Sequence, residues 1–199
     1  ARNLSAEMTA TAPAMLTDLR TSMRRSAFHE ADGTVCHPYV AAAAGNATCG
    51  ELSAGAADSS RASEAWRTYA EALYSGAIEP GTTSELLEWH QHARCAGHGS
   101  RLKLGVLTGS GLDVSNGDVL ETFTLFGWGY GLLQADLIAP FLLQYFAVAA
   151  HGYTRGTWIA PESSYVDRTR QSPSFATPAG LVAPLYLKWT LVWEDPMAH

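Results

Sequence analysis

Residues 119–150 form the most apolar part of this chain, and they restrict its fold more than any other segment. Five large or apolar side chains in it follow one another at intervals of four residues, namely Leu133, Leu137, Phe141, Tyr145 and Ala149. This spacing stacks side chains along one face of a helix. The remaining positions are largely apolar as well, so such a helix must be covered on nearly every side. We therefore expect Leu132–Ala150 to form a helix that is buried in protein.

A membrane span is the rival interpretation, because residues 125–150 are long enough to cross a bilayer. The same stretch contains Asp136, Pro140 and two glutamines, and a lone carboxylate in mid-bilayer costs a few kcal/mol. We therefore prefer a protein interior and expect no membrane partner. The net charge of −6, on a chain with 13 Lys and Arg residues, also lacks the basic surface that nucleic acid requires. We expect no nucleic-acid partner.

Helix signals recur along the rest of the chain. Apolar residues at helical spacing predict a helix over Met8–Met23, and a second helix over 63–76 that ends in a glycine cap. Thr82-x-x-Glu85 has the form of a capping box and opens a third helix. Thr177-Pro178, an N-cap followed by proline, announces the last helix. The sequence therefore predicts an all-α fold of antiparallel helical hairpins joined by long irregular loops.

The first candidate binding segment is the glycine-rich run of residues 127–131, which reads Gly-Trp-Gly-Tyr-Gly. Glycine lets a ligand or another backbone approach closely, and large rings can stack on a sugar. Trp128 and Tyr130 therefore form either a stacking platform or a tightly packed part of the core.

A second candidate lies in the irregular stretch that follows the most buried helix. Arg155, Trp158 and Glu162 occur there within eight residues, and loops held by a rigid scaffold are common places for active sites. A carboxylate beside a stacking ring suits glycoside hydrolysis, because the ring positions the sugar and the carboxylate acts as acid, base or nucleophile. The alternative is that Glu162 only caps a short helix.

Asp136 is a third candidate, because it is the one carboxylate within residues 125–150. It lies four residues before Pro140. It is either buried with a raised pKa and a catalytic role, or it caps a helix that begins near Leu137.

Histidine and cysteine give weaker signals. A group with the residue types of a zinc site occurs at His90, His92, Cys95 and His98. On a continuous helix the first two point about 200° apart, so we expect an exposed helix end, no metal site and no cofactor. Cys36 and Cys49 bracket a Gly- and Ala-rich stretch and are either bridged or free, depending on the redox compartment.

Four segments together resemble the last part of bacterial six-hairpin, or (α/α)6-barrel, glycosidases. They are Ser60–Gly76, Phe126–Asp136, Tyr153–Glu162 and Leu191–Pro196. The resemblance covers most of residues 60–196 and implies a toroid of six helical hairpins. Such barrels typically exceed 199 residues, so the chain is either a single all-α domain over 1–199 or the C-terminal portion of a larger catalytic domain.

The resemblance also implies a function. The chain would be a glycoside hydrolase, with Glu162 and Asp136 as catalytic carboxylates and Trp128, Tyr130, Arg155 and Trp158 binding the sugar. Another chain or a missing segment would complete the barrel. The alternative is a non-catalytic helical domain that binds a glycan or completes an assembly. A secreted or periplasmic location is expected for a glycosidase of this type, with the cytoplasm as the alternative.

Overall fold

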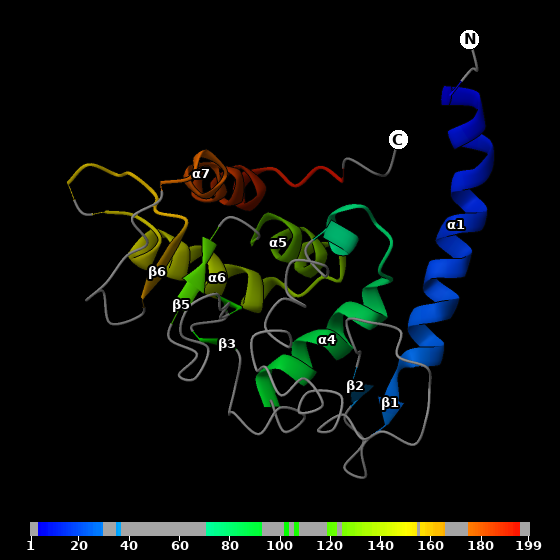
Figure 1. The fold of residues 1–199 in the computed structure, drawn as a ribbon. Coiled ribbons are helices and arrows are strands. Elements are labelled where there is room, and N and C mark those ends of the chain that lie inside the picture. Colours follow the sequence, from blue (N-terminus) through cyan, green and yellow to red (C-terminus); the bar gives the residue numbers. More distant parts are fainter. Residues whose placement is uncertain are drawn as a thin grey trace.

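The computed structural model describes residues 4–29, 35–36, 71–92, 102–103, 106–107, 119–122, 125–154, 156–165 and 175–195. These residues are mostly helical, which confirms the all-α class (Figure 1). The helices are α1 (Leu4–Ser26), α4 (Pro80–His92), α5 (Leu125–Gln134), α6 (Ile138–His151) and α7 (Thr177–Leu191). Residues 71–74 are also helical.

Three short antiparallel strand pairs tie the connecting segments together. The strands are β1 (Phe28–His29), β2 (Val35–Cys36), β3 (Leu102–Lys103), β4 (Val106–Leu107), β5 (Val119–Glu121) and β6 (Ser163–Tyr165). They pair β1 with β2, β3 with β4, and β5 with β6. In the last pair Glu121 lies opposite Ser163. This pair fixes the segment before α5 against the segment after α6.

The long apolar segment is not one helix, and this part of the expectation is wrong. It is divided into α5 and α6 by a turn at Ala135–Leu137. A helix continuing through this point would bring the ring of Pro140 against the carbonyl of Asp136, four residues earlier. The break instead puts Pro140 in the first turn of α6, where no intrahelical N–H bond is needed. Asp136 takes a left-handed conformation, with φ of 58°.

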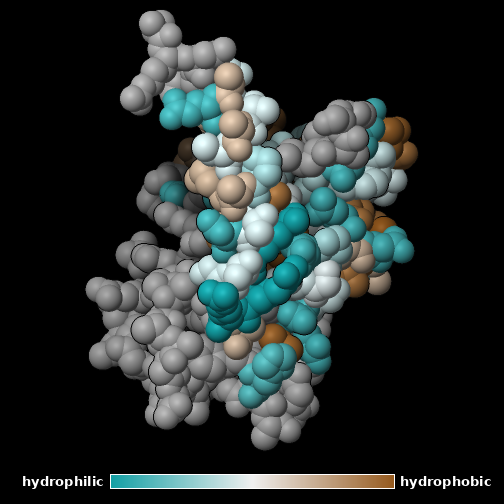
Figure 2. Space-filling model, turned by 90° about the vertical axis from the view of Figure 1, so that its right-hand side faces the viewer, coloured by the Kyte–Doolittle hydropathy of each residue, from teal (hydrophilic) through white to brown (hydrophobic). Residues whose placement is uncertain are grey.

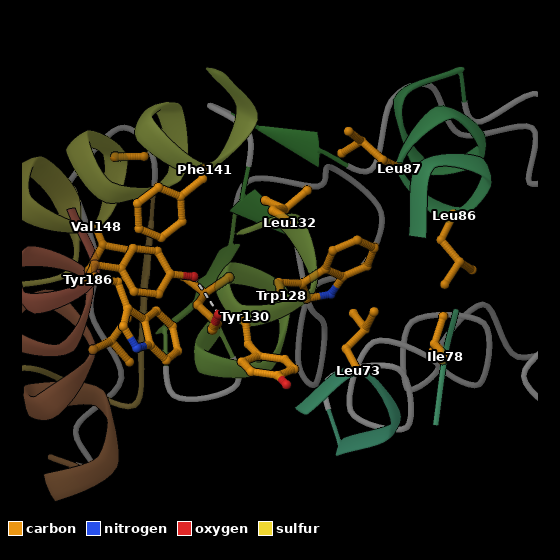
Figure 3. Close-up of a cluster of buried hydrophobic side chains, with 14 residues drawn as sticks. Leu73, Ile78, Leu86, Leu87, Trp128, Tyr130, Leu132, Phe141, Val148 and Tyr186 are labelled. Atoms are coloured by element: carbon orange, nitrogen blue, oxygen red, sulfur yellow. Dashed lines mark hydrogen bonds between the residues drawn. The ribbon is translucent and has the colours of Figure 1, made fainter. Parts of the chain in front are cut away.

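The core forms around α5, whose side chains are buried almost completely (Figure 3). Helix α4 covers one side of it, while α6 and α7 cover the other. The buried cluster draws on every one of these helices, and its largest fully buried members are Trp128, Tyr130, Tyr186, Phe141, Leu73 and Ile78. Glycines make this packing possible, because a Cβ at Gly129 would lie 2.5 Å or less from the ring of Tyr186. A Cβ at Gly131 would lie 2.6 Å from Leu73.

A buried polar contact joins three helices inside this cluster. The hydroxyl of Tyr186 on α7 donates to the carbonyl of Leu125 on α5, and it also lies 2.9 Å from Oε1 of Gln144 on α6. A hydroxyl has one proton, so the bond to Leu125 leaves it as an acceptor toward Gln144. The side-chain amide of Gln144 therefore suits this contact when it is turned so that its N–H₂ group, rather than Oε1, donates to the Tyr186 hydroxyl.

The first helix, α1, touches the rest of the described chain near its C-terminal end only. Arg20 donates to the carbonyls of Gly76 and Ala77 at 2.9 and 3.1 Å, and Arg24 pairs with Glu79. Gly76 has φ of 70°, which confirms the glycine cap expected at the end of the second helix. Arg20 thus secures α1 to the turn that precedes α4.

Two helix starts differ from the sequence expectation. Helix α4 begins at Pro80, two residues before the proposed capping box, so Thr82 lies within the first turn. Helix α7 begins at Thr177 and its N-cap is Ala176, which makes no side-chain cap bond. Proline fits the start of both helices because its fixed φ matches the helix and its missing N–H needs no partner there.

Candidate functional site

The candidate site centres on the Trp158 loop, which we define as residues 153–159 between α6 and β6. Hydrogen bonds across its base close it. The backbone N–H of Thr154 donates to the carbonyl of Ile159 at 2.8 Å, and the N–H of Trp158 donates to the carbonyl of Thr154 at 3.0 Å. The described residues of the loop, 153–154 and 156–159, are therefore held in a defined conformation.

The side chain of Thr154 strengthens this closure. Its hydroxyl donates to the carbonyl of Ile159 at 3.0 Å and accepts from the N–H of the same residue at 3.0 Å. Because its single proton is used in the first bond, the 2.6 Å contact with Thr157 is donated by Thr157. Thr154 therefore links both sides of the loop.

Trp158 is held outward on this loop. It has φ of 54°, a conformation that costs about 1–3 kcal/mol for a bulky residue, and 70% of its surface is exposed. Its ring lies 5.9 Å from the ring of Tyr153, centroid to centroid. A large ring that stays in solvent at the cost of backbone strain is available to a ligand.

Tyr153 anchors the loop to α7. Its hydroxyl donates to the carbonyl of Gly180 at 2.9 Å and accepts from the N–H of Ala183 at 3.3 Å. Burial raises the pKa of Tyr153, so the phenol stays protonated and keeps donating at physiological pH. The ring beside Trp158 is therefore fixed to the scaffold.

Glu162 follows the loop and is partly exposed. Its backbone carbonyl and that of Pro161 both lie 3.4 Å from the hydroxyl of Thr122. Pro161 also bridges to Phe175 just before α7. Glu162 is thus fixed at its backbone between β5 and the start of α7, and it does not cap a helix.

The backbones of Glu162 and Asp136, the two residues expected to be catalytic, lie at opposite ends of α5. The backbone of Glu162 contacts Thr122 just before α5, whereas Asp136 is exposed in the turn just after it. Ten residues of α5 separate these two ends, which is about 15 Å. The two catalytic carboxyl groups lie about 5–5.5 Å apart in a retaining glycosidase and about 6.5–9.5 Å apart in an inverting one. The N-cap residue of α6 is Leu137 rather than Asp136, and it makes no side-chain cap bond.

Trp128 and Tyr130, expected as either a platform or core residues, lie in the core of this structure (Figure 3). Both side chains are completely buried. The hydroxyl of Tyr130 donates to the carboxylate of Asp195 at 2.6 Å, and burial together with this bond raises its pKa. Its ring also packs against Trp193, 5.5 Å away. Tyr130 therefore fastens the segment after α7 to the core.

Several predicted residues lie outside the description that the structure gives. They are Arg155, Cys49, Cys95 and His98, together with the side chains of Cys36, His90 and His92. In the part of the chain that is described, no three His, Cys, Asp or Glu side chains gather as a metal site would require. No helix in that part is long and apolar enough to cross a membrane.

Sequence reasoning missed Tyr153 and Thr154, the residues that hold Trp158 in place. A Thr-x-x-Thr spacing beside a glycine at 156 is a weak turn signal. Nothing local shows that Tyr153 reaches α7, because its partners lie 27 to 30 residues away in the chain.

Comparison of this chain with protein-family models, with curated proteins and with solved structures finds no match. The sequence and the geometry of the Trp158 loop are therefore the features that bear on function.

Proposed function

We propose that this chain is the C-terminal helical-hairpin part of a carbohydrate-active enzyme of the six-hairpin type, with residues 153–162 as its sugar-binding segment. The observation that carries the proposal is the exposed ring of Trp158 on its closed loop. A rigid, exposed aromatic ring offers a flat apolar face at little entropic cost on binding. Such a face fits the apolar side of a sugar ring.

Glu162 is the proposed catalytic carboxylate. It lies four residues after Trp158, on a backbone held by Thr122, and it remains partly exposed. Within this mechanism Glu162 acts as general acid, base or nucleophile at the glycosidic bond, and Trp158 positions the sugar. The second carboxylate would come from further chain, because Asp136 lies at the other end of α5. A secreted or periplasmic location accompanies this proposal.

The alternative function is a non-catalytic helical domain that binds a glycan or completes an assembly. The separation of Glu162 from Asp136 favours it, because hydrolysis by one isolated carboxylate lacks the paired chemistry of most glycosidases. Both functions use Trp158, and they differ in whether Glu162 contributes to turnover.

Binding and hydrolysis of a panel of oligosaccharides separate these functions. Trp158→Ala should weaken binding by about tenfold, the order expected for one aromatic contact, and Trp158→Phe should retain most of it. Retained affinity in Trp158→Ala would contradict the sugar-binding role.

For hydrolysis, Glu162→Gln should lower turnover by about 100-fold or more, while Glu88→Gln, an exposed carboxylate on α4, should not. Binding without turnover in the wild-type chain would favour the non-catalytic function. Full turnover in Glu162→Gln would remove this residue from the mechanism.

A further inference from the structure

Helix α7 contains a proline at its centre. Pro184 is the eighth of the fifteen residues of Thr177–Leu191, and it is exposed. A proline at such a position removes one backbone hydrogen bond, and its ring collides with the carbonyl four residues earlier. Proline is also the least favourable residue for a helix interior. Because an exposed side chain adds little packing, the consequence of Pro184 lies in the backbone of α7.

The carbonyl that Pro184 leaves without its usual donor belongs to Gly180. In a regular helix the N–H of residue 184 would donate to this oxygen, but proline has no N–H. The hydroxyl of Tyr153 donates to it instead, at 2.9 Å. The N–H of Ala183 donates to the same hydroxyl at 3.3 Å. We call the backbone of residues 180–184, which receives this hydroxyl, the α7 socket.

The Trp158 loop is held against α7 at both of its ends. The α7 socket holds Tyr153 at one end, and just past the other end the N–H of Ala176 donates to the carbonyl of Ala160 at 3.2 Å. A Cβ at Gly180 would lie 4.0 Å from the Cβ of Ala160, so the two ends meet the same part of the helix. The ring of Tyr153 lies 5.9 Å from that of Trp158. A displacement of Tyr153 from the socket therefore acts directly on Trp158.

We propose that Pro184 is a positioning residue of the sugar-binding segment. By withholding an N–H from Gly180 it opens the α7 socket to Tyr153, and Tyr153 fixes the Trp158 ring in its outward position. A ring that is already fixed loses less freedom on binding, so the affinity for a ligand is higher. The ligand is that of the proposed function, on which the inference rests, whereas the rigidity of the Trp158 ring is a property of the free chain.

Pro184→Ala tests the proposal because it restores the missing N–H. This N–H competes with the Tyr153 hydroxyl for the carbonyl of Gly180, and the carbonyl no longer meets a proline ring. Helix α7 should become more stable, so Tm should rise by several degrees. Affinity for the oligosaccharide that the wild-type chain binds most tightly should fall about three- to tenfold, because the Trp158 ring is freed. A general loss of structure would not raise Tm while it weakens binding.

The rigidity of the Trp158 ring can be measured without a ligand. The heteronuclear NOE of its indole N–H, assigned by its loss in Trp158→Phe, should fall in Pro184→Ala and in Tyr153→Phe. Pro13→Ala is the matched control, because Pro13 also lies inside a helix. Helix α1 forms the face that Figure 2 presents, and Figure 1 shows it on the opposite side of the molecule from β6. This control should leave the NOE and the affinity at their wild-type values.

The double variant Tyr153→Phe/Pro184→Ala distinguishes one shared hydrogen bond from two independent effects. Both substitutions remove the same contact, so the NOE and the affinity should fall no further than in the single variants. Adding Pro184→Ala should also raise the Tm of Tyr153→Phe, since the carbonyl of Gly180 regains a donor.

A Pro184→Ala chain whose Trp158 NOE equals that of wild type would overturn the proposal, and so would additive losses in the double variant. A Tm that falls together with the NOE would also overturn it, because Pro184 would then only support the fold. A lower NOE with unchanged affinity would show that the rigidity of the ring does not matter for binding, which is equally contrary. If no oligosaccharide binds the wild-type chain, the proposed function fails, while the NOE comparison still decides whether Pro184 positions Trp158.

Discussion

Replacing Gly129 by alanine tests the central packing of the fold. The new Cβ would lie 2.4 Å from Cζ of Tyr186 and 2.5 Å from its Cε1 and Oη. Tyr186 cannot move away easily, because its ring lies 4.9 Å from that of Phe141 and 5.8 Å from that of Trp189. Its hydroxyl is also held by the carbonyl of Leu125. The collision is therefore with a fixed ring.

The expected cost follows from two opposing effects. Overpacking of a filled core costs about 1–3 kcal/mol, and alanine in a helix recovers about 0.5–1 kcal/mol relative to glycine. The free energy of unfolding should therefore fall by up to about 2.5 kcal/mol, and Tm by up to roughly 10 °C for a chain of this size. Urea unfolding followed by circular dichroism measures the first quantity, and a thermal scan measures the second.

Gly81→Ala is the matched control, because a Cβ at Gly81 on α4 would meet nothing within 4 Å. It should raise stability by up to about 1 kcal/mol. In a Tyr186→Leu background the ring is gone, so Gly129→Ala should lose its penalty. A Gly129→Ala variant that is more stable than wild type, as Gly81→Ala should be, would show that the Tyr186 ring is not fixed against α5.

Three further outcomes are expected in urea titrations. Burial raises the pKa of Tyr186 above its ordinary value of 10.0, so above about pH 10 the unfolded chain loses this proton before the folded chain does. The contribution of Tyr186 to the free energy of unfolding should be constant below that pH and should fall above it by up to about 1.4 kcal/mol per pH unit. Tyr186→Phe should make this fall less steep, and an equal slope in the two proteins would contradict the expectation. Arg20→Ala should cost about 1–2 kcal/mol because two partly buried carbonyls lose a charged donor. Arg24→Ala, at a side chain that is 63% exposed, should cost less than about 1 kcal/mol; equal costs would count against the docking of α1. Gln144→Leu should change the free energy of unfolding by less than about 1 kcal/mol. The substitution removes one hydrogen bond, but it also removes a buried amide atom that has no partner among the described residues. A loss of several kcal/mol would show that this atom does have a hydrogen-bond partner.

The sequence predicts the helices well where a local signal exists. The apolar spacing of Met8–Met23 and the glycine cap at Gly76 both correspond to structure, because periodicity and backbone freedom act locally. The division of the apolar segment also has a local cause, since Pro140 disfavours a continuous helix through Asp136. The regular spacing of apolar residues from Leu133 to Ala149 nevertheless predicted one continuous helix across this break.

Burial could not be assigned from the sequence alone. Every position of α5 is apolar or glycine except its last, Gln134, so periodicity does not show whether Trp128 faces a ligand or the core. The burial of α5 depends on partners that are distant in the chain, because Gly129 packs on Tyr186 and Gly131 packs on Leu73, each more than 50 residues away. The outward position of Trp158 likewise depends on the anchoring of Tyr153 to α7. Contacts at such distances in the chain leave no local pattern.

The indole N–H resonances of the chain test the central claim most directly. Six tryptophans give six such signals, and loss of one signal in Trp158→Phe assigns Trp158. On titration with the oligosaccharide panel, the Trp158 signal should shift with saturation, while those of the buried Trp128 and Trp189 stay in place. If no sugar in the panel moves the Trp158 signal, or if only the buried tryptophans respond, then the Trp158 loop is not the sugar-binding segment.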